Sequence, residues 1–141
     1  MSRIIAIDYG NKRVGVATTD PLQITTTALG TFTPDETVVF LQSYLQKEEV
    51  SAIVVGDPLQ MNGTPSQSAQ GAQQFAQRIQ NKFSHIKVER YDERFTSKIA
   101  MQAMVAGGAS KKQRRDKSLI DQVSACVILQ SYLEYKHNFE P

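Results

Sequence analysis

Two short, almost uninterrupted apolar runs constrain the fold of this chain more than any other feature. Residues 3–8 read RIIAID, and residues 52–56 read AIVVG. Continuous apolar runs of this length, rich in β-branched residues, predict strands that are buried on both faces of a sheet. Such a sheet needs helices on both sides, so the sequence predicts an α/β fold.

The remaining segments fit this architecture. Further strands are expected at residues 13–18, 28–32 and 87–91, and helices are expected after the capping residues Thr33, Thr64 and Thr96 and over residues 117–136. The order is therefore three strands, a helix, a strand, a helix, a strand and two helices. An antiparallel meander followed by strand–helix–strand units implies a mixed sheet flanked by helices.

Length and composition narrow the class of protein. The chain has 141 residues, 40% of them hydrophobic and 21% charged, which predicts one globular domain over residues 1–141. No apolar run approaches the roughly 18 residues of a membrane span, and the N-terminus does not resemble a signal peptide. Because Cys126 is the single cysteine, an internal disulfide is excluded. We expect a cytoplasmic protein without a membrane partner.

Three carboxylates stand where elements begin or end. Asp8 closes the first strand, Glu93 follows the strand at 87–91, and Asp121 lies on the last helix. If they converge, their oxygens suit Mg²⁺ or Mn²⁺, and two such ions can assist hydrolysis of a phosphodiester. The alternative is structural: Asp8 and Glu93 would be loop carboxylates, and Asp121 would pair with a nearby Lys or Arg.

The position of Asp121 on its helix is informative. Ala125, Ile128 and Tyr132 follow it at helical spacing, so Asp121 is expected on an inward, mostly apolar stripe. An unpaired carboxylate there would be costly, and a partner is therefore expected.

Two glycines follow Asp8. Gly10 and Gly15 permit close approach of a backbone or a phosphate. Alternatively, Gly10 only supplies a positive φ angle for a hairpin turn.

A loop over residues 56–64 lies between a strand and a capped helix. Loops at this place in α/β sheets bind ligands, and amides at the start of the next helix can face an anion. The alternative is an ordinary connection.

The net charge of only +2 by itself argues against a nucleic-acid partner, but the cations are concentrated in one segment. Residues 111–117 contain five cations and one anion. A flexible basic loop beside Asp121 could bind phosphates, although a solvated surface loop is the alternative. The cations proposed to contact nucleic acid in this loop are Lys111, Lys112, Arg114 and Arg115.

Four segments together resemble one family. They are DYGNKRVGVA at residues 8–17, GDPLQMNGT at 56–64, DERFTS at 92–97 and DQVSACVILQ at 121–130. The chain is similar to the bacterial YqgF/RuvX family, whose members are named as Holliday junction resolvases or pre-16S rRNA nucleases. The resemblance runs from about Ile4 to Leu133. It departs from the family pattern at Asp57, Gln60, Asn62 and Ser124, and it leaves the role of Asp57 open.

The resemblance implies a ribonuclease H-like fold with a five-stranded mixed sheet. It implies a metal-dependent endonuclease with Asp8, Glu93 and Asp121 as catalytic and metal-binding acids, and it assigns Arg13 and Arg94 to phosphate. The leading prediction is 5′-end maturation of pre-16S rRNA with two Mg²⁺ or Mn²⁺ ions, with the ribosomal particle as a potential partner.

Three alternatives stay open. The first is cleavage of four-way DNA junctions, which needs paired sites in a homodimer, whereas a monomer favours RNA. The second is a non-catalytic RNA-binding module in transcription. The third is an ATP-binding protein of the actin and sugar-kinase type, which is disfavoured because such proteins bind ATP between two domains and 141 residues supply one.

Overall fold

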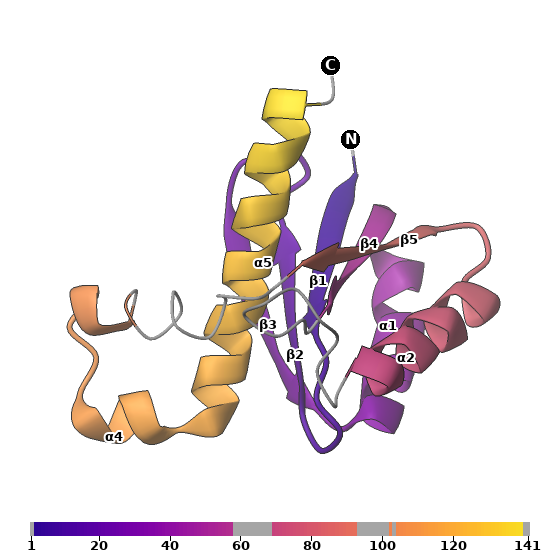
Figure 1. The fold of residues 1–141 in the computed structure, drawn as a ribbon. Coiled ribbons are helices and arrows are strands. Elements are labelled where there is room, and N and C mark those ends of the chain that lie inside the picture. The colour runs from indigo at the N-terminus through magenta and orange to yellow at the C-terminus, as the bar shows by residue number, and fades with distance from the viewer. Residues whose placement is uncertain (1, 58–68, 93–101, 103, 140–141) are drawn as a thin grey trace.

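The computed structural model describes residues 2–57, 69–92, 102 and 104–139. In this part of the chain, five strands form one mixed sheet in the order β3-β2-β1-β4-β5 (Figure 1). β1 is antiparallel to β2 and parallel to β4, and β4 is parallel to β5. The strands are β1 (Arg3–Asp8), β2 (Val14–Thr19), β3 (Thr26–Phe32), β4 (Val50–Asp57) and β5 (Lys87–Asp92).

Helices cover both faces of this sheet, as the apolar runs predicted. α1 and α2 lie on one face and α5 lies on the other, with α4 beside the start of α5 (Figure 1). α1 begins at a capping box in which the Thr33 hydroxyl accepts from the backbone of Glu36 and the Glu36 carboxylate accepts from the backbone of Thr33. The helices are α1 (Pro34–Lys47), α2 (Ala69–Lys82), α4 (Lys111–Arg115) and α5 (Lys117–Phe139).

The central strand β1 divides its side chains between two cores. Ile5 and Ile7 pack in the cluster that includes α1 and α2, whereas Ile4 and Ala6 pack in the cluster that includes α5. All four are fully buried. The prediction of a strand buried on both faces is therefore confirmed, and β1 holds its last residue, Asp8, on a rigid element.

The structure differs from the sequence prediction in the basic segment and at several element ends. The basic segment expected as a loop forms α4, because Ser110 and Gln113 make a second capping box at its start. β3 begins at Thr26, two residues before the predicted start, where it pairs with Thr19 of β2. Most of the helix predicted after Thr96 lies outside the described residues. Within that predicted helix, residues 102 and 104–106 are described, and they are helical. Among the described helices, none is long and apolar enough to cross a membrane.

Candidate active site

The candidate site lies at the edge of the sheet where the parallel strands end. Asp8 is the last residue of β1 and stands opposite Gly15 of the antiparallel strand β2. In the neighbouring parallel strands, Ile7 is level with Val55 of β4, and β4 and β5 end together with Asp57 opposite Asp92. Ligands of α/β sheets bind beyond such carboxyl ends.

Gly15 allows α5 to approach this edge closely. A Cβ atom at Gly15 would lie 2.2 Å from the backbone oxygen of Asp121 and 2.5 Å from its carbonyl carbon, which no real side chain tolerates. The group that approaches Gly15 is therefore the backbone of α5. This packing brings Asp121 to the end of β1, although the two acids are far apart in the sequence.

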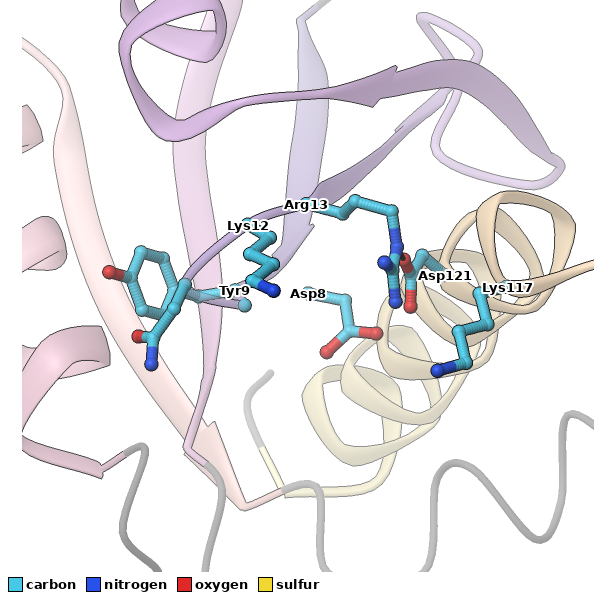
Figure 2. A pocket seen from close by; sticks show the side chains of 8 residues that line it. Asp8, Tyr9, Lys12, Arg13, Lys117 and Asp121 are labelled. Carbon is cyan, nitrogen blue, oxygen red and sulfur yellow. Dashed lines mark hydrogen bonds and ion pairs between the residues drawn. The ribbon is translucent and has the colours of Figure 1, made fainter.

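Asp8 and Asp121 line one cavity of about 500 Å³. Their side chains and that of Lys117 point into the same space, and the guanidinium of Arg13 lies beside Asp121 (Figure 2). The lining mixes two anions with three cations and is mostly polar. It consists of Asp8, Tyr9, Gly10, Asn11, Lys12, Arg13, Lys117 and Asp121.

The carboxylate of Asp121 is paired with Arg13. Arg13 donates from Nε to Oδ2 of Asp121 over 2.9 Å, with the Arg13 side chain 43% exposed and that of Asp121 21% exposed. The expected inward stripe is also present, since Ala125, Ile128 and Tyr132 are buried. Asp121 thus has the partner that its position required, and that partner comes from the other end of the chain.

Several other predicted site residues fall outside the cavity or outside the described residues. Glu93 and Arg94 are outside the described residues, as is most of the loop at 56–64. Lys111 and Lys112 are exposed on α4 and do not line the cavity, while the side chains of Arg114 and Arg115 are not described.

Gly10 lines the cavity, and its φ angle is not positive, so the simple hairpin alternative does not account for it. A Cβ atom at Gly10 would lie 2.6 Å from the backbone oxygen of Arg13. The glycine therefore permits a tight turn through contact with the segment that carries Arg13.

Two cations of the cavity were not predicted as site residues. Lys117 begins α5 and precedes Asp121 by one helical turn, so both lie on the same helix face. Lys12 adjoins Arg13 in the turn between β1 and β2. The four-residue spacing of Lys117 from Asp121 could have predicted that Lys117 lines the cavity. For Lys12, the only such indication in the sequence was its position beside Arg13.

The donor chemistry of the cavity fits a hard divalent cation. Both acids offer carboxylate oxygens, the ligands that Mg²⁺ and Mn²⁺ prefer. No group of three or more metal-ligating side chains occurs within the residues that the structure describes. Of the three acids predicted as metal ligands, two line this cavity, and the third, Glu93, lies outside the described residues.

The fold can be compared with solved structures independently of the sequence. The fold is similar to that of Thermus thermophilus RuvC in complex with a Holliday junction substrate, with a TM-score of 0.55 and 17% identity, covering 99% of this chain and 97% of that chain. A second structure of Thermus thermophilus RuvC gives a TM-score of 0.55 at 13% identity, covering 94% and 96% of the two chains. The predicted ribonuclease H-like α/β fold is thereby confirmed.

Sequence comparison then gives the family. The model of the RuvX family, described as "Holliday junction resolvase", matches residues 2–135, and the chain belongs to this family. A relative from Flavobacterium psychrophilum is 47% identical over 96% of this chain and 99% of its own length. A relative from Phocaeicola vulgatus is 49% identical over 96% of this chain and 98% of its own length. Both are named "Putative pre-16S rRNA nuclease". The predicted family membership is confirmed, and the names of these relatives agree with the nuclease class that it implied.

Proposed function

We propose that this protein is a metal-dependent endonuclease that hydrolyses phosphodiester bonds in the 5′-end maturation of pre-16S rRNA. One observation supports this most directly: Asp8 and Asp121, from opposite ends of the chain, line the same cavity as Lys12, Arg13 and Lys117. Carboxylates and cations side by side suit a divalent cation and a phosphate together. The names of relatives that match over nearly their whole length support this choice of substrate.

Asp8 and Asp121 hold divalent cations, with Glu93 as the third acid. Glu93 directly follows Asp92, the last residue of β5, and β5 runs parallel to β1 through β4. Both strands therefore end at the same edge of the sheet. When bound, two Mg²⁺ or Mn²⁺ ions would activate water and stabilise charge on the departing oxygen.

The cations of the site hold the substrate. Lys12, Lys117 and Arg13 lie within reach of a phosphate in the cavity, and Arg94 follows Glu93. Four cations in the sequence of α4 extend this surface toward a longer strand, and phosphate contacts of this kind weaken as salt rises. These outer cations are Lys111, Lys112, Arg114 and Arg115.

The test is cleavage of 5′-extended pre-16S RNA by the purified protein, with Mg²⁺ or Mn²⁺ and with a chelator. We expect metal-dependent cleavage that Asp8→Asn and Glu93→Gln each reduce by at least about 10²-fold, the scale of losing one charge-stabilising group. Folding of each variant is followed by circular dichroism. Near-normal cleavage by either variant removes that acid from the mechanism.

The second candidate is cleavage of four-way DNA junctions, favoured by the family's description and by the likeness in fold to RuvC. A junction assay run beside the RNA assay separates the two, and sedimentation measures whether the protein is a monomer or a homodimer. Tight RNA binding without cleavage of either substrate would favour a binding module. RNA cleavage measured with and without the ribosomal particle tests whether the particle is a partner. Fractionation of cells tests the proposed cytoplasmic location.

A further inference from the structure

The ion pair between Arg13 and Asp121 places a guanidinium against a carboxylate that is proposed to bind metal. The guanidinium lies 2.9 Å from Oδ2 of Asp121, inside the cavity that Asp8 also lines. Arginine remains protonated at all ordinary pH values, so this contact cannot be relieved by loss of a proton. The pair must instead open when another cation needs the same oxygen.

We propose that Arg13 is an exchangeable counter-ion of the active site. It occupies Asp121 in the metal-free protein, competes with the divalent cation for that carboxylate, and is released toward the substrate phosphate when the cation binds. This inference rests on the proposed function, because it takes Asp8 and Asp121 as metal ligands. It makes Arg13 a positioning residue whose availability to the substrate depends on metal.

The contacts of Arg13 suit such an exchange. Arg13 makes one hydrogen bond to Asp121, through Nε, and its side chain is 43% exposed. Arg3 is held differently: Nε pairs with Glu48, and a second nitrogen donates to the backbone oxygen of Thr19 over 3.0 Å. A single, partly exposed ion pair contributes little free energy, whereas two or more fixed contacts make a guanidinium harder to displace.

The position of Arg13 also gives the exchange a direction. Arg13 lies between Lys12 and β2, and Lys12, Arg13 and Lys117 line the same cavity. A guanidinium that leaves Asp121 stays among cations that attract a phosphate and repel a free cation. The released Arg13 is therefore directed toward an anion, and phosphodiester oxygens are the anions that its planar group binds best.

The exchange is tested by Mn²⁺ binding in the absence of nucleic acid, measured by titration calorimetry. Arg13→Ala is expected to bind Mn²⁺ about three- to ten-fold more tightly than the wild type, since both competition and charge repulsion are removed. Lys12→Ala removes a neighbouring cation without freeing Asp121 and should tighten binding about two-fold at most.

Arg78→Ala is the control, because Arg78 pairs with Asp35 over 2.8 Å outside the cavity and its side chain is 48% exposed, close to the 43% of Arg13. It should leave Mn²⁺ affinity unchanged. An equal effect of Arg13→Ala and Lys12→Ala would overturn the exchange and leave only general electrostatics. Weaker Mn²⁺ binding by Arg13→Ala would overturn it as well.

A measurement on the wild type avoids any dependence on how the variant folds. In NMR spectra, the Nε–H signal of Arg13 should exchange with solvent faster on addition of Mg²⁺, while that of Arg3 stays unchanged. If metal binding requires Asp8 and Asp121 but leaves this signal unaltered, the exchange is wrong and the proposed function stands. If no divalent cation binds to either the wild type or Arg13→Ala, both are overturned.

Discussion

Two partly buried carboxylates, Asp121 in the first turns of α5 and Glu89 on β5 in contact with α5, differ in how they are held. The side chain of Asp121 is 21% exposed and that of Glu89 is 23% exposed. Asp121 pairs with Arg13 alone among the described residues. Glu89 accepts from the Tyr132 hydroxyl and pairs with Lys87 over 2.6 Å. At nearly equal exposure, Asp121 thus has one side-chain donor and Glu89 has two within the part of the chain that the structure describes.

The environment of Glu89 favours a fixed charge. Partial burial raises the pKa of Glu89, but hydrogen bonds from Lys87 and Tyr132, together with the charges of Lys87 and Lys136, lower it below its usual value of 4.5. Its donors come from β5 itself and from α5, so the carboxylate joins the sheet to the helix. Glu89 thus has the contacts of a structural acid, and Asp121 those of an acid that can change its partner.

The largest expected effect comes from replacing each of these acids by its amide. Asp121→Asn should lower the rate of RNA cleavage by at least about 10²-fold, because a proposed metal ligand is lost. Glu89→Gln should stay within about two-fold, since Glu89 is not among the residues that line the cavity. Cleavage rates at saturating Mn²⁺ measure both. Similar losses of cleavage rate in the two variants would contradict the proposed functional difference between the two acids.

Gly15 offers the next test, because it sets the distance between β2 and Asp121. Gly15→Ala should destabilise the protein by about 1–3 kcal/mol and lower Mn²⁺ affinity, since α5 must move away from the end of β1. Calorimetry and thermal unfolding measure the two quantities.

The control is Gly108→Ala, which has a φ angle of +82° and no atom within 4 Å of the added Cβ. It should also cost about 1 kcal/mol through backbone strain but leave Mn²⁺ affinity unchanged. If both variants lose metal affinity, the lower affinity is caused by the lower stability of the protein and not by a displacement of Asp121.

Sequence reasoning located the acids better than it located their partners. Asp8 was found because it ends an apolar strand, and Asp121 because it interrupts an apolar helix stripe, and both are local patterns. Arg13 was expected to contact phosphate, yet it pairs with Asp121, which is 108 residues away. No local pattern encodes such a contact, because it depends on how closely α5 packs against Gly15.

Residues 110–117 show a different limit. Five cations suggested a loop, whereas the capping pair Ser110 and Gln113 was enough to start a short helix. Lys117 then begins α5, and its spacing places it beside Asp121 in the cavity. Composition described the charge of this segment correctly, but the capping pattern and helical spacing determined which cation lines the cavity.

The stability of the protein should depend on pH through Glu89. Because its pKa is lowered in the folded state, its contribution is present above about pH 4.5 and is lost as the pH falls through the lower, folded value. Glu89→Gln should cost about 1–2 kcal/mol at neutral pH, the scale of a hydrogen bond to a charged group. Urea unfolding at pH 7 and pH 3 should show this cost shrinking in acid. A cost that is the same at both pH values would contradict the charged role.

The smallest effect is expected at Ser124, which lies on α5 three residues after Asp121. Its side chain is almost fully buried, and its Oγ has no hydrogen-bond partner among the described residues. Ser124→Ala removes the uncompensated hydroxyl and should stabilise the protein by up to about 1 kcal/mol without changing cleavage or Mn²⁺ affinity. A loss of metal affinity here would mean that this hydroxyl helps to position Asp121, and that Asp121 has more support than its ion pair with Arg13.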